Sequence, residues 1–151
     1  MTLKIEIQTA ELDKALTRLA SAVGDMTPIM RAIGGELEAA TERNFDDEGA
    51  RIAAKWKPSR RAMQDGGQTL RDTGRLVSSI SAGGAGHVSE VTPHSVFVGT
   101  NVEYAAIHQF GGKAGRNRKV TIPARPFFGL NAEDEQDIAE LIGKMLDKAM
   151  A

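Results

Sequence analysis

The sequence of 151 residues contains no cysteine. This absence excludes disulfide bonds, thiolate nucleophiles and zinc sites with cysteine ligands. Long apolar runs are also missing, because no stretch approaches the roughly 18 residues of a membrane span and the charged N-terminal region lacks the apolar core of a signal peptide. The length is typical of one globular unit. We therefore expect a single cytoplasmic domain over residues 1–151, with no membrane contact.

Net charge is nearly absent as well, since 19 basic residues oppose 20 acidic ones. Divided along the chain, however, the charge is −5 over residues 1–48, +5 over 49–75, −2 over 76–112, +5 over 113–125 and −4 over 126–151. Blocks of opposite sign predict a molecule whose faces carry opposite charges.

The basic segments could neutralise phosphates or meet an acidic protein surface. The candidate contact residues in these segments are Arg51, Lys55, Lys57, Arg60, Arg61, Arg71, Arg75, Arg116, Arg118 and Lys119. Residues 49–75 contain a single aromatic residue, Trp56, and so offer no platform on which bases could stack. We therefore favour an acidic protein partner over direct DNA contact. A plain solvated loop is a third interpretation.

The first half of the chain predicts a strand and two helices. Apolar and polar residues alternate over residues 3–7, as in a strand with one buried face. Apolar spacing predicts a helix over 10–23 capped by Thr9, and a second over 28–45 capped by Thr27. Gly34 and Gly35 interrupt the second helix, which suggests tight packing against another element.

The second half predicts a long flexible loop followed by short elements. The loop covers residues 49–74, and the turn at Thr73 and Gly74 leads into a strand over 76–81. The remaining expected elements are a hairpin of 88–91 with 95–98, a helix over 101–109 capped by Asn101 and closed by Gly111, a strand over 120–122, and a final helix capped by Asn131. The fold class that follows is α+β, with helices covering a small, mostly antiparallel sheet.

Residues with the spacing of a catalytic or metal site are scarce. His87, His94 and His108 form no metal-binding pair, no serine lies in a nucleophile elbow, and the glycine clusters match no phosphate loop. The acidic run 46–48 lacks the ligand spacing of a calcium loop, so we interpret it as a solvated helix end. We expect no enzyme activity, no cofactor and no metal.

The aromatic residues number only seven, and five of them fall within residues 97–128. They belong to two segments, VGTNVEYAAIHQFGG (98–112) and IPARPFFGL (122–130), which follow LRDTGRLVSSI (70–80) and the WKP of 56–58. In this order the segments resemble the phage virion morphogenesis family of tail-completion proteins found in tailed phages and Mu-like prophages. The motif residues are Trp56, Pro58, Thr73, Gly74, Asn101, Tyr104, His108, Gln109, Phe110, Gly111, Arg125, Pro126 and Phe127.

The resemblance implies a non-enzymatic structural protein with a fold like that of tail terminators. It implies that the protein completes the tail and enables head-tail joining as an oligomeric ring of six subunits, with the tail tube or terminator and the head-neck connector as partners. Such a protein is found in the bacterial host cytoplasm during assembly and then in the virion. The alternative is a neck factor that contacts the genome end through its basic loops. A small hydrolase is a third hypothesis, which the missing catalytic set argues against.

Particular roles follow for the motif residues. Tyr104, Ile107 and Phe110 either anchor a short helix to the sheet or shape a subunit contact, while His108 and Gln109 bond loop backbone. Arg125 is expected to bond a carboxylate, or carbonyls near Gly111, and so to fix the two following phenylalanines. The loop 49–74 is expected to order only against a neighbouring subunit or the tail tube.

Overall fold

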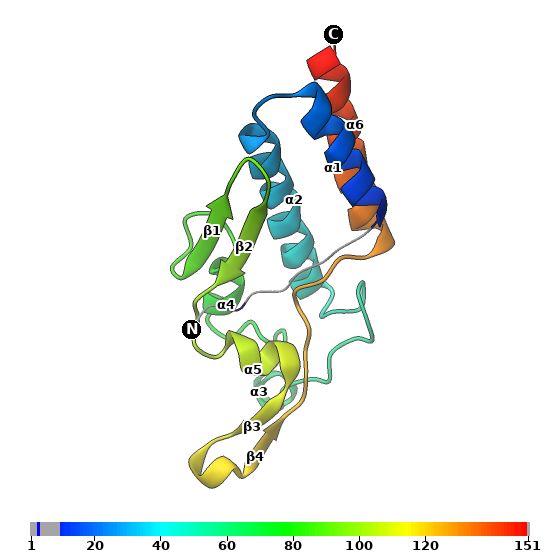
Figure 1. Ribbon diagram of the computed structural model, residues 1–151. Helices are drawn as coiled ribbons and strands as arrows, with labels where there is room; N and C mark the ends of the chain where they lie inside the picture. The colour runs from blue at the N-terminus through cyan, green and yellow to red at the C-terminus, as the bar shows by residue number, and fades with distance from the viewer. Residues whose placement is uncertain (1–2, 4–9, 151) are drawn as a thin grey trace.

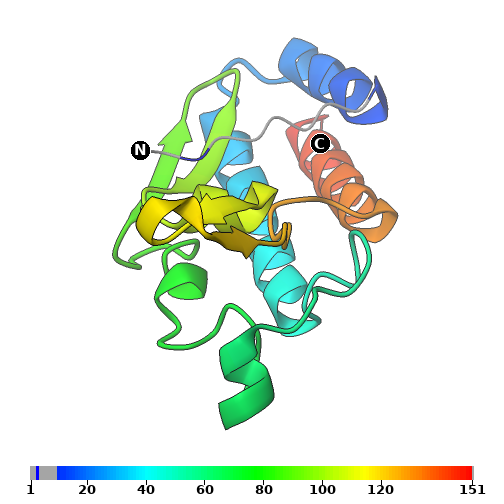
Figure 2. The same cartoon turned by 90° about the horizontal axis from the view of Figure 1, so that it is seen from below.

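The computed structural model describes residue 3 and residues 10–150, and it has the expected α+β class (Figure 1). In chain order the elements are α1 (Ala10–Ala22), α2 (Thr27–Asp46), α3 (Arg60–Asp65), α4 (Arg75–Ser78), β1 (His87–Val91), β2 (Val96–Thr100), α5 (Ala105–Phe110), β3 (Gly112–Ala114), the 3₁₀ turn η1 (Arg116–Arg118), β4 (Val120–Ile122) and α6 (Ala132–Met150). The long helix α2 runs through the middle of the molecule, and the other elements are arranged around it (Figure 2).

One hydrophobic cluster lies between α1, α6 and the first half of α2. Leu19 of α1, Ile29 and Ile33 of α2, and Ile138 and Ile142 of α6 are buried together there. The four-residue spacing within α2 and α6 places these side chains on one face of each helix, as the apolar periodicity predicts. Helices α1 and α6 consequently lie side by side.

A second cluster lies at the other end of α2. The ring of Phe45 packs edge-on against Trp56 at 5.6 Å between centroids and contacts Phe127 at 5.2 Å. The other buried members of this cluster are Leu3, Leu76, Ile80, Val102 and Ala105. The core is therefore divided in two, and α2 contributes to both parts.

The strands form two separate hairpins within the described residues. β1 pairs antiparallel with β2, so the hairpin expected at 88–98 is confirmed. β4 is confirmed too, but its partner β3 follows α5 directly and the sequence pattern did not predict it. A Cβ on Gly34 would lie 2.9 Å from Val96 Cγ2, so α2 packs tightly on β2 at this point, whereas a Cβ on Gly35 would meet nothing.

The strand expected over 76–81 is wrong. Gly74, with φ of 77°, begins the short helix α4, and turns continue to residue 81. Leu76 and Ile80 are both buried and lie four residues apart, which is a helical spacing that the serines between them disguised. The long loop also contains the helix α3, where the side chain of Ser59 accepts a hydrogen bond from the backbone N–H of Ala62. Whether residues 49–74 need a neighbour to order stays a prediction.

Of the expected helix caps, one is confirmed and two are wrong. Asn131 Oδ1 accepts from the backbone N–H of Asp134, as a cap should. α2 begins one residue earlier than expected, so that Thr27 is its first residue and Met26 stands at the cap position, while the side chain of Asp25 accepts from the N–H of Thr27. Asn101 donates its N–H to Gly86 and so ends the β-hairpin, and α5 starts only at Ala105. Residues 4–9, with the expected strand and the Thr9 cap, lie outside the described residues, while Leu3 forms an antiparallel bridge with Thr100.

Candidate functional site

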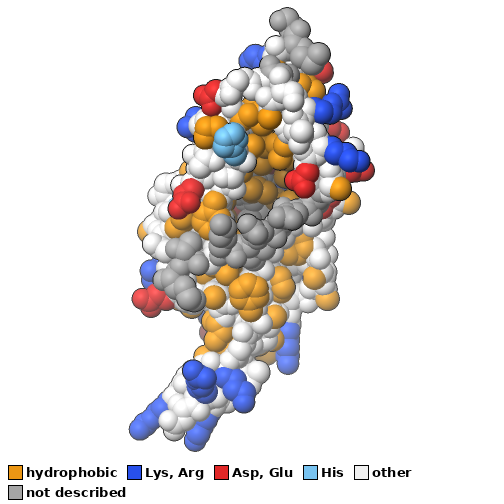
Figure 3. Space-filling model, in the orientation of Figure 1, with side chains coloured by type: hydrophobic (Ala, Val, Ile, Leu, Met, Phe, Trp, Pro, Cys, Tyr) orange, Lys and Arg blue, Asp and Glu red, His pale blue; other side chains and the backbone are white. Residues whose placement is uncertain are grey.

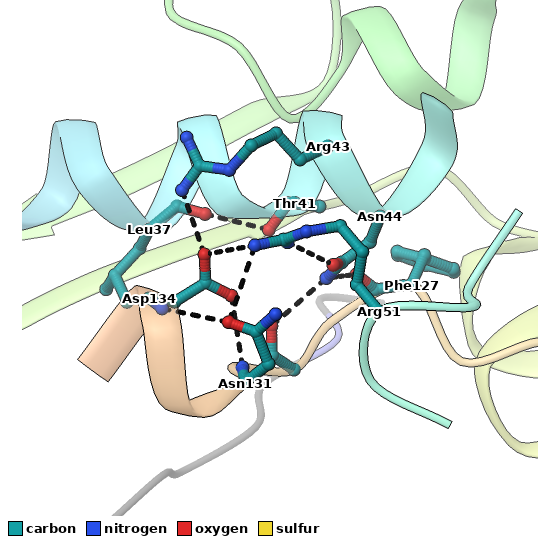
Figure 4. A network of polar contacts seen from close by, with 9 residues as sticks. Leu37, Thr41, Arg43, Asn44, Arg51, Phe127, Asn131 and Asp134 are labelled. Carbon is teal, nitrogen blue, oxygen red and sulfur yellow. Dashed lines mark hydrogen bonds and ion pairs between the residues drawn. The ribbon is translucent and has the colours of Figure 1, made fainter. Parts of the chain in front are cut away.

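The C-terminal segment is fixed to α2 by a buried carboxylate. Asp134 Oδ1 accepts hydrogen bonds from Arg51 Nη2 at 2.7 Å and from Arg43 Nη2 at 2.9 Å, and Oδ2 accepts from the N–H of Asn131 (Figure 4). Burial alone would raise the pKa of Asp134, but the hydrogen bonds from Arg51, Asn131 and Arg43 together hold it below its ordinary value. Arg51 is thus an internal ion-pair partner, so its expected role at a phosphate or protein surface is wrong.

Two amide side chains hold the segment that follows Pro126. Asn44 Nδ2 donates to the carbonyls of Phe127 and Gly129, at 2.8 and 3.0 Å. From the other side, Gln109 Oε1 accepts from the N–H groups of Phe127 and Phe128, both at 3.0 Å. The expectation that Gln109 bonds loop backbone is therefore confirmed. These bonds place Phe127 in the core, where its ring contacts that of Phe45.

A cleft of about 540 Å³ brings three of the sequence motifs together. One wall comes from the start of α3, and another from α4 and the segment that leads into it. The start of α5 and residue 125 supply the rest. The lining residues are Ser59, Arg61, Leu70, Asp72, Thr73, Gly74, Arg75, Leu76, Tyr104, His108 and Arg125. Tyr104 lies at its rim, where Arg75 stands over the phenol ring at 6.0 Å from the centroid.

The contacts of Arg125 and His108 differ from those expected. Arg125 Nε donates to the carbonyl of Lys57 at 2.8 Å, and not to the Gly111 region. The reason is that Gly111 packs directly on the backbone of Ala124, which leaves no room for a side chain between them. His108 bonds the loop only through its carbonyl, which accepts from the N–H of Arg125, while its buried Nδ1 has no partner among the described residues. Burial and the charge of Arg125 lower the pKa of His108.

The hairpin β3–η1–β4 projects from the body at the end away from α1 and α6, and we call it the arm (Figure 1). Exposed basic side chains gather at its tip, as Figure 3 shows, and no acidic residue lies between positions 112 and 122. The basic residues of the arm are Lys113, Arg116, Arg118 and Lys119. At its base Phe110 is 63% exposed and on its strand Val120 is 52% exposed. Phe110 therefore does not anchor α5, and its exposure favours the interpretation that it forms a contact.

The remaining motif and basic residues are dispersed. Arg61 is bonded to the carbonyls of Gly66 and Gln68, and Arg71 pairs with Asp46 at 2.8 Å. Lys55, Lys57, Pro58, Arg60 and Asn101 are exposed. The basic residues of the two segments are thus distributed among intramolecular ion pairs, the cleft, the arm and other exposed positions. Their spacing along the chain does not reveal this distribution.

The sequence reasoning missed Asn44 and Asp134. Asn44 is fully buried in a helix whose other buried positions are mainly apolar, and its role could not be read from periodicity. Asp134 did have a signal, because an acidic residue three positions after a capping residue is the pattern of a capping box. Its N–H and carboxylate exchange hydrogen bonds with Asn131 in that arrangement.

Two kinds of site are absent from the described residues, a metal site and a membrane-spanning helix. Residue 3 and residues 10–150 contain no group of three His, Asp or Glu side chains that could hold a metal ion. In the same part of the chain, no helix has the length and apolarity needed to cross a membrane.

Comparison with known proteins places the chain among phage proteins. Residues 7–147 match the model of the phage virion morphogenesis family. The chain is 48% identical over 139 residues to the Mu-like prophage FluMu G protein 2 of Haemophilus influenzae, covering 91% of each chain. It is 28% identical to the putative capsid assembly protein G of Escherichia phage Mu, covering 96% of this chain and 86% of the relative. No solved structure matches it significantly. The resemblance seen in the sequence is confirmed: the chain belongs to the phage virion morphogenesis family.

Proposed function

We propose that the protein is a non-enzymatic assembly factor that completes the phage tail and enables the head to join it, acting as an oligomeric ring. The family match supports an assembly role, and the relative from phage Mu is named as a putative capsid assembly protein. The observation that carries the finer proposal is the arm, because a projecting hairpin with exposed apolar and basic side chains has the composition of a contact surface.

The arm combines two kinds of attraction for a protein partner. Phe110 and Val120 offer apolar area that water solvates poorly, while the four cations at the tip attract acidic surfaces over several ångströms. A tail tube, a tail terminator or a head-neck connector with an acidic rim would fit both. The arm would then bind the ring to the particle, while other surfaces of each subunit would contact the neighbouring subunits.

The distribution of charge supports a ring. Helix α6, which carries exposed acids, and helix α4, which contributes Arg75 to the cleft, lie on different sides of α2 (Figure 2). Contacts between two different surfaces of identical subunits generate rings when the rotation closes. Opposite charge on opposite flanks favours such head-to-tail pairing, and six copies are the expected number.

Complementation of a Mu-like prophage that lacks the gene would test this function. After induction, electron microscopy should show filled heads and tails that remain separate, and the wild-type gene should restore joined particles. Replacement of Lys113, Arg116, Arg118 and Lys119 by glutamine should reproduce the separate heads and tails with the protein still folded. If particles without the protein join normally, the proposed function is wrong.

The second candidate function is a neck factor that contacts the genome end. The tip of the arm favours it, because four cations without an acid could meet phosphates. DNA binding of this kind would weaken steeply with salt. Retention of the purified protein on duplex DNA at 50 mM salt, and its loss in the glutamine variant of the arm, would favour this role over a protein contact.

A further inference from the structure

The cleft beside α4 and α5 carries an excess of positive charge. Arg61, Arg75 and Arg125 line it, and Asp72 is the one acidic residue among its lining residues. Asp72 Oδ1 lies 3.6 Å from Arg61 Nε, and the side chain of Asp72 is 74% exposed. Asp72 therefore neutralises positive charge only at the rim of the cleft. The deeper part of the cleft therefore has a net positive potential, which a low-dielectric wall strengthens.

Arg125 lies in that deeper part with its charge unmatched. The residue is only 6% exposed, and of its side-chain nitrogens Nε alone has a hydrogen-bond partner in the part of the chain that the structure describes. No carboxylate of that part forms an ion pair with it. Burial lowers the pKa of Arg125, which reflects the cost of holding a cation away from water. The Nη groups are thus free to donate two hydrogen bonds to an incoming anion.

His108 adds a second polar group without a partner. Its Nδ1 is buried and unbonded within the described residues, and the residue lines the same cleft as Arg125. A buried polar atom without a hydrogen bond is rare in folded proteins and costs free energy. This atom and the charge of Arg125, which no carboxylate of the described residues pairs, lie in one cleft and indicate a site that is completed by another molecule.

We propose that this cleft binds a carboxylate side chain from a second copy of the protein, supplied by the exposed acidic stripe of α6. The stripe consists of Glu133, Asp137 and Glu140, which lie at four- and three-residue spacing on one face of the helix. This inference rests on the ring proposed above. The bidentate fork of a guanidinium matches a carboxylate, and the stripe carries the complementary charge on the opposite flank.

The shape of the site favours a protein carboxylate over a nucleic acid. Arg125 is 6% exposed as a residue and lines a cleft, so its guanidinium can be reached by a slender side chain. The convex backbone of duplex DNA would touch the rim at Arg75 and leave Arg125 unpaired. The experiment must therefore distinguish a protein carboxylate from a nucleic-acid phosphate as the anion that the cleft binds.

Carbodiimide cross-linking tests the contact, because it joins a carboxylate only to an amine within bonding distance. In the variant Arg75→Lys the charge remains and an amine is added at the rim of the cleft. We expect an intermolecular link from Lys at position 75 to Glu133, Asp137 or Glu140, mapped by mass spectrometry in purified protein and in isolated tails. The matched control is Arg60→Lys, which lies outside the cleft and should give at least tenfold less of this link.

Charge reversal supplies a second measurement. Arg75→Glu should reduce particle joining at least tenfold in the complementation assay, and the added change Asp137→Lys should restore it. Reversal of Glu90, an exposed acid on β1 and therefore outside α6, should restore nothing. The inference is overturned if no link to α6 forms, if α6 reversal fails to rescue, or if duplex DNA protects Arg75→Lys from modification. After any of these outcomes, restoration of joined particles by the wild-type gene would still support the proposed function.

Discussion

Trp56 Nε1 donates a hydrogen bond to the carbonyl oxygen of Pro126 at 2.9 Å, which joins two motifs that lie 70 residues apart. The indole is 3% exposed and packs against Phe45. Its ring also lies so close to Gly49 that a Cβ there would be 2.2 Å from Nε1, and Gly49 has φ of 83°. The start of the basic loop is therefore part of the core and not a free segment.

Replacement of Trp56 should accordingly destabilise the fold. Trp56→Ala is expected to lower the free energy of unfolding by about 3 to 5 kcal/mol, because a large buried ring is lost. Trp56→Phe retains much of the apolar volume but leaves the Pro126 carbonyl unpaired, so we expect a smaller loss of about 1 to 3 kcal/mol. Urea denaturation measures both, and Lys55→Ala at an exposed position is the control. Equal stability of Trp56→Ala and the wild type would contradict this role.

Asp134 should make stability depend on pH in the acid range. Its folded pKa lies below the ordinary value of 3.8, because its hydrogen bonds outweigh burial, so the unfolded chain binds more protons as pH falls. The stabilisation is present above pH 3.8 and is lost as pH falls through the lowered folded pKa. Asp134→Asn should remove this dependence and cost at least about 2 kcal/mol at pH 7, since two arginines lose their partner. Denaturation midpoints between pH 2 and 7 check both statements.

The neighbouring glycines of α2 should respond oppositely to alanine. At Gly34 a Cβ would lie 2.9 Å from Val96 Cγ2, so Gly34→Ala forces helix and hairpin apart and should cost about 1 kcal/mol or more. At Gly35 a Cβ meets nothing, and Gly35→Ala should stabilise the helix by about 0.5 to 1 kcal/mol. Thermal unfolding distinguishes the two. Val96→Ala should relieve part of the Gly34→Ala defect, and the absence of any relief would place the clash elsewhere.

Two phenylalanines should separate folding from assembly. Phe127 is fully buried, so Phe127→Ala should cost about 3 to 5 kcal/mol of stability and lower the yield of folded protein. Phe110 is 63% exposed, so Phe110→Ser should leave stability within about 0.5 kcal/mol of the wild type. In prophage complementation the Phe110 variant should still fail to join heads and tails. If a stable Phe110→Ser protein joins heads and tails normally, the base of the arm does not take part in the contact.

Sequence patterns predicted the elements whose signal is local. The final helix α6, the Asn131 cap and the β1–β2 hairpin rest on periodicity and turn residues within one segment, and all three are confirmed. The strand expected at 76–81 failed because the burial of Leu76 and Ile80 is decided by the second core cluster. Tertiary packing overrode the local preference there.

The candidate site was predictable in its members but not in its geometry. The motifs containing Thr73, Tyr104 and Arg125 were singled out from sequence, and the cleft brings them together. Their partners depend on long-range contacts, such as the bond from Arg125 to Lys57 across 68 positions, which no spacing rule contains. The same reason explains why Arg51 was assigned to a surface although it pairs with Asp134 inside the molecule.

The division of the core along α2 has a mechanical consequence. The helix contributes Ile29 and Ile33 to one cluster and Phe45 to the other. It therefore forms a rigid connection between the α6 side of the molecule and the base of the arm. A 20-residue helix is stiff over its length, and displacement at one end is carried to the other with little bending. If the protein forms the proposed ring, docking of the arm on a particle would therefore tilt α6 against the neighbouring subunit, and the binding of one subunit would set the orientation in which the next one binds.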